Sequence, residues 1–268
     1  MISAAPVRDA VGAATDALAA AGCDTPRLDA ELLIADALGV ERGALVTDPE
    51  RSIPGAAARV IAERVRRRVV REPVAYILGR KGFRHIELAV DSRVLIPRPE
   101  TELLVEVGLE LPQGARVHEV GTGSGVVALA LRHERPDLQV SASDISAPAI
   151  EVARANAARL GLELELTAEP GLPAGDFDLV LANLPYVATG ETSRLAPEIQ
   201  RYEPREALVA GSDGLDAIRE LIDQAPTGTA LALEHSPHQA QAVRGLLRDA
   251  ASRRDLAGHE HMTLGTAP

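Results

Sequence analysis

The sequence predicts an α/β protein in which a doubly wound, Rossmann-like sheet follows a small N-terminal helical bundle. Two observations carry this prediction. Helical patterns separated by short breaks fill residues 6–70, and from Glu100 onward strands and helices alternate regularly. Alternation of this kind builds a mostly parallel sheet with helices on both faces. A chain of 268 residues, 46% of them hydrophobic, is long enough for two cores of unequal size.

The helical domain is expected to cover residues 1–73. Its clearest signal begins with Thr25, a suitable N-cap that precedes a proline, and stops at Gly39. Apolar residues at helical spacing predict an earlier helix around residues 10–18 and a later one over residues 57–70. The helical domain is therefore expected to contain at least three helices.

Residues 74–96 change to short β-like runs with Gly79 and Gly82 in a turn, and this predicts a β-hairpin linker. Just before it, residues 64–68 form an arginine-rich run within a helical segment. We expect this run to form a solvated helix face rather than a contact with phosphate or a partner.

The third domain, residues 97–268, carries the alternating pattern. A first strand ends in the glycine-rich turn Gly121–Gly125, a second ends at Asp144, and an apolar third one ends at Asn183, with helical segments after the first two. A long loop, a helix, a strand, a last helix and a strand-like tail complete the chain. Ligands bind at the carboxyl ends of the strands in such sheets, so these three features are expected at the ligand-binding edge.

Composition disfavours several classes of function. The net charge of −11, from 28 Lys and Arg against 39 Asp and Glu, repels phosphate backbones, and five aromatic residues offer little surface for stacking bases. A single cysteine, Cys23, excludes an intrachain disulfide and a thiolate metal cage. With no apolar run near the length of a membrane span and no signal-peptide pattern, we expect a cytoplasmic protein.

The glycine-rich turn Gly121–Gly125 predicts close approach of the backbone to a ligand. The dinucleotide fingerprint requires a glycine where Val126 stands, so a NAD site is disfavoured. The spacing instead suits a nucleoside, with Asp144 accepting hydrogen bonds from both ribose hydroxyls and Glu119 facing a positive ligand group. The alternative is an ordinary tight turn with a helix-capping aspartate.

Together, "HEVGTGSG" and "SASD" look like the nucleoside site of the class I methyltransferases that use S-adenosylmethionine. The chain more closely resembles the bacterial glutamine methyltransferases that modify peptide chain release factors. That resemblance covers about residues 10–265 and rests on strings in the same order and at nearly the same spacing: "TPRLDAELLIADALG", "PVAYILGRKGF", "VDSRVLIPRPETELLVE", "NLPYV" and "EPREALVAGSDGLDAIREL". Within these strings, "LIPRPETE" is specific to that family.

The resemblance implies a class I (Rossmann-like) methyltransferase sheet of seven strands with the last strands antiparallel. It implies S-adenosylmethionine as the cofactor, without a metal, and the glutamine of a Gly-Gly-Gln motif in release factors as the methyl acceptor. The helical domain would bind the body of the factor. We expect a monomer that contacts neither nucleic acid nor membrane. The cofactor-binding residues would be Glu119, Gly121, Thr122, Gly123, Ser124, Gly125, Asp144, Ile145, Glu169 and Asn183.

The string "NLPY" supplies the expected catalytic residues. An amide nitrogen is a poor nucleophile, so its lone pair has to be turned toward the methyl group. The side-chain oxygen of Asn183 and the backbone carbonyl of Leu184 can each accept one N–H of a planar NH2 group. Pro185 stiffens the turn, and Tyr186 forms a flat wall beside the substrate.

Three departures from the family pattern keep alternatives open. Leu184 replaces the usual proline, and Asn-Leu-Pro-Tyr is common in ribosomal RNA adenine dimethyltransferases, which are the main rival; a non-catalytic S-adenosylmethionine-binding module is the other. Glu169 stands at a shifted position for an adenine contact. His235-Ser236 replaces the commoner Ile-Gly. Histidine pairs near the C-terminus could suggest metal ligands, but with no cysteine and no spaced acidic partner we expect solvated loop histidines. The candidate pairs are His235 with His238 and His259 with His261.

Overall fold

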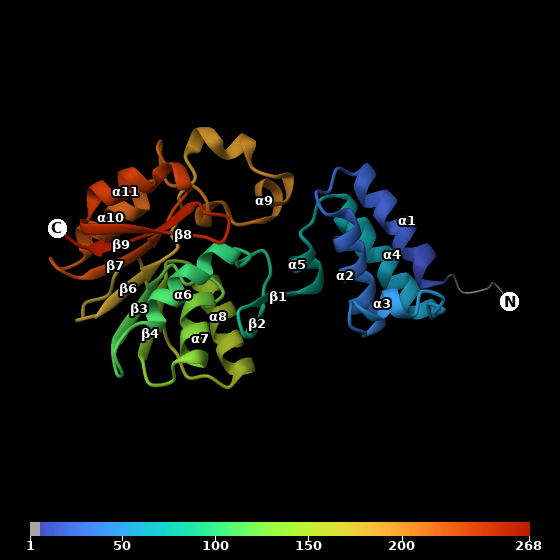
Figure 1. The fold of residues 1–268 in the computed structure, drawn as a ribbon, viewed down its shortest axis with the longest axis horizontal. Helices are drawn as coiled ribbons and strands as arrows, with labels where there is room; N and C mark the ends of the chain where they lie inside the picture. Colours follow the sequence, from blue (N-terminus) through green and yellow to red (C-terminus); the bar gives the residue numbers. More distant parts are fainter. Residues whose placement is uncertain (1–5) are drawn as a thin grey trace. The chain divides into compact units, whose positions relative to one another are not determined.

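The computed structural model describes residues 6–268, which form two compact units (Figure 1). The first unit extends to Gly79 and also contains the later segment Pro197–Tyr202. The second unit consists of Arg80–Ala196 and Glu203–Pro268. No helix within the described part of the chain has the length and apolar character needed to cross a membrane.

The first unit is the expected helical bundle. It contains α1 (Val7–Ala20), α2 (Pro26–Leu38), α3 (Ala44–Thr47), α4 (Gly55–Val69), α5 (Val74–Leu78) and, from the later segment, α9 (Pro197–Tyr202). Its core is made of apolar side chains such as Leu18, Ala30 and Ile34. Helix α2 ends as predicted, because Gly39 adopts the left-handed conformation (φ 64°) that glycine tolerates best.

The prediction of β-like structure for residues 74–78 is wrong. These residues form the helix α5, which starts after Pro73 and ends at Gly79, where φ is 71°. Proline before the first turn and glycine after the last favour a short helix even though its residues suit strands. The predicted hairpin is present but shorter. It comprises β1 (Arg80–Phe83) and β2 (Ile86–Ala89), which pair in antiparallel fashion within the second unit.

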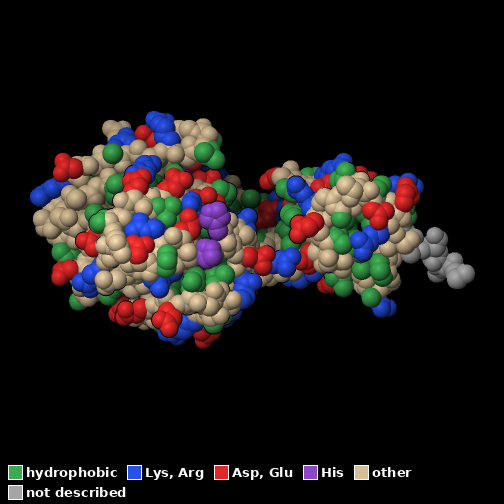
Figure 2. All heavy atoms as spheres, turned by 60° about the horizontal axis from the view of Figure 1, so that its bottom comes forward, with side chains coloured by type: hydrophobic (Ala, Val, Ile, Leu, Met, Phe, Trp, Pro, Cys, Tyr) green, Lys and Arg blue, Asp and Glu red, His purple; other side chains and the backbone are tan. Residues whose placement is uncertain are grey.

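Helix α9 is bound to the bundle by a partly buried ion cluster. Glu198 accepts hydrogen bonds from Arg71 at 2.7 Å on each carboxylate oxygen and forms an ion pair with Arg68 at 2.8 Å. Arg68 also donates to Asp29 at 2.7 Å and is 6% exposed. The expectation of a wholly solvated arginine face is therefore wrong for Arg68. Elsewhere on the visible face of this unit, basic and acidic side chains are interspersed (Figure 2).

We expect Glu198→Ala to lower the free energy of unfolding by about 2 kcal/mol at pH 7, because it leaves buried positive charge undercompensated. Burial opposes ionisation, but hydrogen bonds from Arg71 and Arg68 lower the pKa of Glu198 to about 2. This folded-state pKa lies below the ordinary value of 4.5, so the stabilisation is present above pH 4.5 and is lost as the pH falls toward 2.

Urea unfolding at several pH values measures this effect. The exposed Glu41, replaced by alanine, provides the control and should leave stability within about 0.5 kcal/mol of the parent. Equal loss of stability in the Glu198 and Glu41 variants would contradict the role of the ion cluster.

The second unit is built on a seven-stranded sheet in the order β5-β4-β3-β6-β7-β9-β8. Neighbouring strands from β5 to β7 are parallel, and β9 pairs in antiparallel fashion with both β7 and β8. The strands are β3 (Arg116–Val120), β4 (Gln139–Asp144), β5 (Glu165–Ala168), β6 (Leu179–Ala182), β7 (Ala230–Glu234), β8 (Arg248–Arg254) and β9 (Glu260–Thr266). The predicted sheet, including its antiparallel end, is confirmed.

Helices cover both faces of this sheet (Figure 1). One layer contains α6 (Glu102–Leu109), α7 (Val126–Glu134) and α8 (Ala147–Leu160), and the opposite layer contains α10 (Asp216–Gln224) and α11 (Ala240–Leu246). Strand β6 is buried along its whole length, as its apolar sequence predicts. The remaining helical segments are the short turns η1 (Pro99–Thr101), η2 (Thr189–Arg194), η3 (Arg205–Ala207) and η4 (Pro237–Gln239).

Candidate active site

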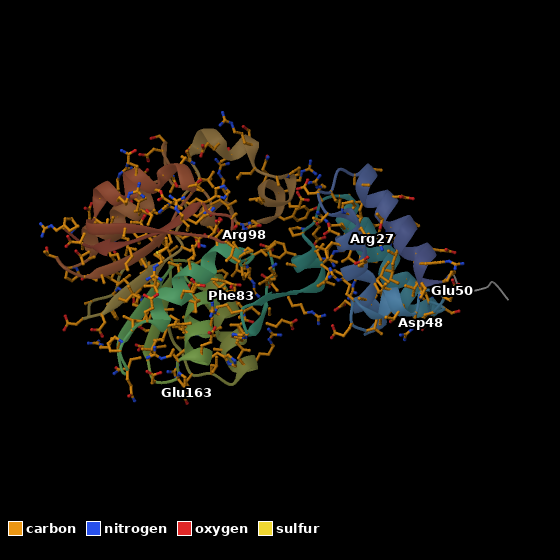
Figure 3. The ribbon with its side chains drawn as sticks, viewed as in Figure 1. Arg27, Asp48, Glu50, Phe83, Arg98 and Glu163 are labelled. Atoms are coloured by element: carbon orange, nitrogen blue, oxygen red, sulfur yellow. The ribbon has the colours of Figure 1, made fainter. Side chains whose placement is uncertain are left out.

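A cavity of the second unit lies at the carboxyl ends of β3, β4 and β6, where the alternating pattern predicts a ligand. Arg98, labelled in Figure 3, also lines it and donates to Glu203 at 2.6 Å. The predicted site residues that line this cavity are Glu119, Gly121, Thr122, Gly123, Ser124, Asp144, Ile145, Asn183, Leu184 and Pro185. These ten residues, predicted from separate segments of the sequence, thus lie together at one cavity.

The glycine-rich turn after β3 is closely packed at Gly121 and Gly125 and open at Gly123. Gly121, Gly123 and Gly125 have φ values of 75°, 55° and 84°. A Cβ atom at Gly121 would lie 2.9 Å from Cδ2 of Leu184, and one at Gly125 would lie 2.7 Å from Cδ1 of Leu129. Positive φ thus favours glycine at all three positions, and close packing adds to this preference at Gly121 and Gly125. Gly125 is not among the residues that line the cavity and instead supports the turn.

Asp144 ends β4 and is fixed by backbone donors. Its Oδ2 accepts from the N–H of Gly123 and its Oδ1 from the N–H of Ser146, each at 2.8 Å. Burial raises the pKa of this carboxyl group. Each carboxylate oxygen has a further lone pair, so the side chain can hold the turn and still accept two ligand hydroxyls. The neighbouring Ile145 is 74% exposed and offers apolar surface at the cavity edge.

Glu119 both lines the cavity and caps a helix. Its Oε2 accepts from the hydroxyl of Thr122 at 2.6 Å and from the N–H of Ala128 at 2.9 Å, near the start of α7. The carboxyl group is 2% exposed, and burial raises its pKa to about 7. A cationic ligand group would favour ionisation of this carboxyl group, in keeping with the predicted role.

Glu169 does not lie with the other predicted cofactor residues. It lines a different hollow, which also contains Arg116 and His118. Successive side chains of a strand point to opposite faces of the sheet, so His118 and Glu119 lie on different sides of β3. The chain after β5 brings Glu169 to the His118 side. Its position removes Glu169 from the cofactor residues that we propose.

Asn183 follows β6, and its side chain has a fixed orientation. Its Nδ2 donates to Oγ1 of Thr101 at 3.1 Å, while the Thr101 hydroxyl is hydrogen-bonded to the carboxyl group of Glu234. Since a hydroxyl has one hydrogen, a Thr101 that donates to Glu234 must accept from Asn183. The amide nitrogen is therefore held by protein, and Oδ1 of Asn183 remains available to a ligand.

Tyr186 lies beside this network rather than in the cavity lining. Its hydroxyl is 3.5 Å from Oε1 of Glu234, a distance at the limit of a hydrogen bond, and burial raises its pKa. Gln239 donates to the Tyr186 backbone carbonyl at 3.0 Å and also binds the carbonyl of Asp213. The turn that contains Tyr186 is thus held from behind.

Sequence reasoning assigned no role to Thr101 or Glu234, although each is 1% exposed. Thr101 belongs to the "LIPRPETE" string, whose specificity was the available signal. Oε2 of Glu234 is buried and has no hydrogen-bond partner within residues 6–268. Such a group is costly to bury, and this favours a role in positioning Asn183 over one in stability.

The buried Glu234 predicts that stability falls as the pH rises. Burial raises its pKa to about 7, above the ordinary value of 4.5. The folded protein therefore binds this proton more tightly than the unfolded chain, and the stability from this group, complete below pH 4.5, is lost as the pH rises through 7. We expect Glu234→Gln to become progressively more stable relative to the parent between pH 5 and pH 8, as measured by urea unfolding.

Glutamine is nearly isosteric with glutamate and retains one acceptor oxygen, so the comparison isolates ionisation. A difference in unfolding free energy that stays constant across this pH range would show that Glu234 does not ionise near neutral pH. Glu119→Gln provides a second case of the same sign, because burial also raises the pKa of Glu119 to about 7.

The fold of the second unit has a solved counterpart. A structure titled as the hMettl16 catalytic domain in complex with the MAT2A 3'UTR hairpin 6 is 14% identical and has a TM-score of 0.51; it covers 76% of this chain and 80% of that one. Identity at this level shows the fold alone.

Sequence comparison is more specific. The family described as "PrmC N-terminal domain" matches residues 9–79, and the "Methyltransferase small domain" matches residues 99–208. A protein of Caulobacter vibrioides named release factor glutamine methyltransferase is 40% identical over 270 residues, covering 94% of this chain and 93% of its own. A protein of the same name from Bordetella pertussis is 42% identical over 259 residues, covering 90% of this chain and 94% of its own. Because these relatives are at least 40% identical and cover at least 90% of this chain, the chain belongs to the release factor glutamine methyltransferase family.

Proposed function

We propose that this protein transfers a methyl group from S-adenosylmethionine to the side-chain amide nitrogen of the glutamine in the Gly-Gly-Gln motif of peptide chain release factors. The observation that carries the proposal is the oriented amide of Asn183, whose nitrogen is bonded to Thr101 and whose oxygen is left for a donor. An NH2 group is such a donor. The names of the relatives support the choice of glutamine as its source.

The cavity fits the proposed cofactor. The open space at Gly123, which lines the cavity, admits a ligand against backbone, and Asp144 offers carboxylate oxygens to hydroxyl groups. Glu119 places a carboxyl group at the same cavity, where it favours a positive ligand. S-adenosylmethionine, when bound, supplies an electrophilic methyl group on a positively charged sulfur. The set of residues contains no cysteine and requires no metal.

The residues after β6 prepare the acceptor nitrogen. Oδ1 of Asn183 and the backbone carbonyl of Leu184 would each accept one N–H of the substrate amide, and this turns the nitrogen lone pair toward the methyl group. Pro185 limits the freedom of the turn. The methylated amide loses its extra proton readily, so positioning and electrostatics account for the rate without a general base.

The helical unit would recognise the body of the release factor, because a Gly-Gly-Gln loop offers too little surface for selective binding. Helix α9 follows the Asn183–Tyr186 turn in the sequence and belongs to this helical unit. The ion cluster around Glu198 thus holds α9 within the helical unit. We further propose a monomer that acts in the cytoplasm without direct contact with nucleic acid.

Tritiated S-adenosylmethionine tests the function directly. We expect the protein to label purified release factor, and a release factor variant with glutamine replaced by alanine in the Gly-Gly-Gln motif to remain unlabelled. Label in ribosomal RNA instead would favour an adenine methyltransferase. Binding of the cofactor without label in either substrate would favour a non-catalytic binding module.

A further inference from the structure

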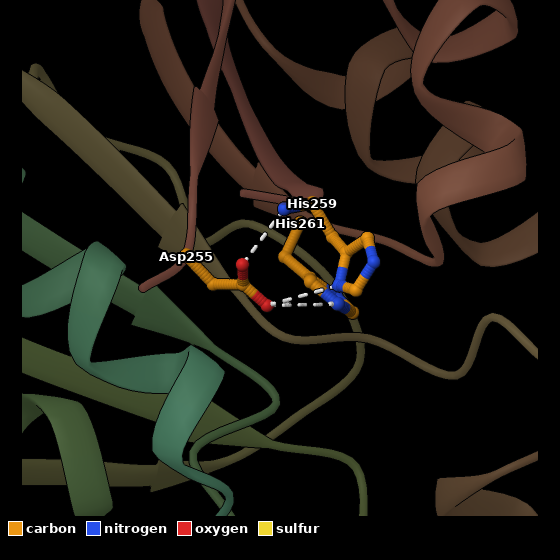
Figure 4. Close-up of side chains that lie close together, drawn as sticks. All are labelled: Asp255, His259 and His261. Atoms are coloured by element: carbon orange, nitrogen blue, oxygen red, sulfur yellow. Dashed lines mark hydrogen bonds and ion pairs between the residues drawn. The ribbon is translucent and has the colours of Figure 1, made fainter. Parts of the chain in front are cut away.

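The hairpin between β8 and β9 gathers three potential metal ligands far from the methyl-transfer residues in sequence. Asp255 follows β8, His259 directly precedes β9, and His261 is the second residue of β9 (Figure 4). One ligand atom from each residue lies within 4.8 Å of the others. Oδ2 of Asp255 is 3.5 Å from Nε2 of His261 and 3.7 Å from Nδ1 of His259.

Local backbone geometry brings these side chains together. The N–H of Asp255 donates to the carbonyl of His259 at 2.9 Å, and the left-handed Gly258 (φ 88°) closes the turn. Both histidine rings are directed toward the same carboxylate oxygen, Oδ2 of Asp255. The N–H of His259 donates to Oδ1 of Asp255 at 2.8 Å and leaves Oδ2 to face both rings. The ligands are thus arranged by a short turn without distant parts of the chain.

The electrostatic surroundings favour a cation. The adjoining hollow is lined by Asp255 together with Glu100, Glu102 and Glu106. Arg254 also lines it, but its guanidinium group donates to Glu260 and to a backbone carbonyl.

His261 is not a structural histidine satisfied by the core. Its side chain is 18% exposed, and its Nδ1 is buried without a hydrogen-bond partner in the described chain. The other nitrogen, Nε2, faces Asp255. His235 shows the contrast, since its two ring nitrogens lie 2.7 Å from the hydroxyl of Thr263 and 3.0 Å from the carbonyl of Ser236.

We propose that Asp255, His259 and His261 bind one divalent transition-metal ion, with Zn²⁺ as the best fit. Zinc takes imidazole and carboxylate ligands at about 2.0–2.2 Å in tetrahedral geometry, which places neighbouring ligand atoms about 3.3–3.6 Å apart. The two aspartate–histidine distances of 3.7 and 3.5 Å need little change to reach this spacing. Two imidazoles select against Mg²⁺ and Ca²⁺, which prefer oxygen ligands.

The proposed site differs from the expectation of solvated loop histidines, which rested on the lack of a cysteine and of a spaced acidic partner. Asp255 is that partner, four residues before His259. The bound ion would hold the hairpin closed and has no part in methyl transfer. Its loss should therefore affect the stability of the hairpin and leave the cofactor cavity unchanged.

Titration calorimetry with ZnCl2 in chelator-treated buffer tests the proposal on the full chain. We expect one zinc ion per chain and, for His261→Ala, affinity at least tenfold weaker. Asp255→Asn, which keeps the size of the side chain, should also weaken binding. His238→Ala is the matched control, because His238 is an exposed histidine outside the hairpin, and it should bind as the parent does. MgCl2 should give no saturable heat.

Cobalt substitution provides an independent measurement, since tetrahedral Co²⁺ has intense visible absorption that an octahedral aqueous ion lacks. The parent and His238→Ala should show this absorption, and the hairpin variants should not. The proposal is overturned if the parent binds no zinc saturably, if His261→Ala binds as tightly as the parent, or if His238→Ala loses binding.

Discussion

Asn183→Ala is expected to lower the rate of methyl transfer to release factor by about 100-fold or more, the usual loss when one preorganised polar group is removed from an active site. The oxygen of Asn183 is oriented before substrate arrives, because its Nδ2 is bonded to Thr101 at 3.1 Å and Thr101 is bonded to Glu234. Alanine removes this hydrogen-bond acceptor, so the substrate NH2 group that receives the methyl group is free to rotate. Cofactor affinity should change by much less.

Two further variants separate the acceptor oxygen from its support. Thr101→Val keeps the shape of the side chain but removes the hydroxyl that orients Asn183, and a loss of about tenfold is expected, equivalent to one hydrogen bond. Leu184→Pro restores the motif Asn-Pro-Pro-Tyr that is usual in the family and keeps the backbone carbonyl. Its rate of methyl transfer should therefore stay within about tenfold of the parent rate.

Rates are measured with tritiated cofactor at saturating concentrations, and cofactor affinity is measured separately by calorimetry. A parental rate in Asn183→Ala would refute the proposal that Asn183 orients the substrate amide. If Thr101→Val lowered only the cofactor affinity, Thr101 would shape the cofactor cavity and would not orient the side chain of Asn183.

Asp144→Ala is expected to weaken binding of S-adenosylmethionine by about 1.5–3 kcal/mol, the range for hydrogen bonds to a charged acceptor. The carboxylate lines the cavity and is fixed by the N–H groups of Gly123 and Ser146. The loss therefore combines two ligand hydrogen bonds with a less ordered glycine turn. Asp144→Asn keeps one acceptor oxygen and should lie between the parent and the alanine variant.

Calorimetry on folded variants decides this prediction. S-adenosylhomocysteine is a useful second ligand, because it carries the same ribose without the positive charge. A ribose contact predicts equal losses for both ligands. Unchanged affinity of a folded Asp144→Ala for both ligands would place the ribose elsewhere, and a loss for S-adenosylmethionine alone would assign Asp144 to the positive charge.

Local sequence determined the features that depend on a few neighbouring residues. Gly39 ends α2 because glycine tolerates its left-handed φ of 64°. The apolar run of β6, the turn at Gly121 and the motif beginning with Asn183 were all located correctly, since strand burial and tight turns constrain residue type at each position. The expected positions of Asp144 and Asn183 followed from the edge rule for parallel sheets.

Only the tertiary structure decided which distant side chains meet. Thr101, Glu234 and Asn183 come from separate segments, and nothing in their spacing reveals the network that orients the amide. The face of the sheet that receives Glu169 depends on the path of the chain after β5, which residue types do not specify. The β-like residues Val74–Leu78 form a helix because the flanking proline and glycine favour one, so the local strand preference was overridden.

The same distinction explains the ion cluster and the metal ligands. An arginine run looks solvated in sequence, yet Arg68 is buried because Glu198 returns to the bundle from a distant segment. Asp255 is close to His259 in sequence, but the turn at Gly258 is what points both toward His261. Sequence thus determined the fold class, the glycine turn and the amide motif, since these depend on local conformation and burial. Partners joined by long-range packing were decided only by the tertiary structure, because charge and hydrogen-bond pairing depend on distances that a linear sequence does not contain.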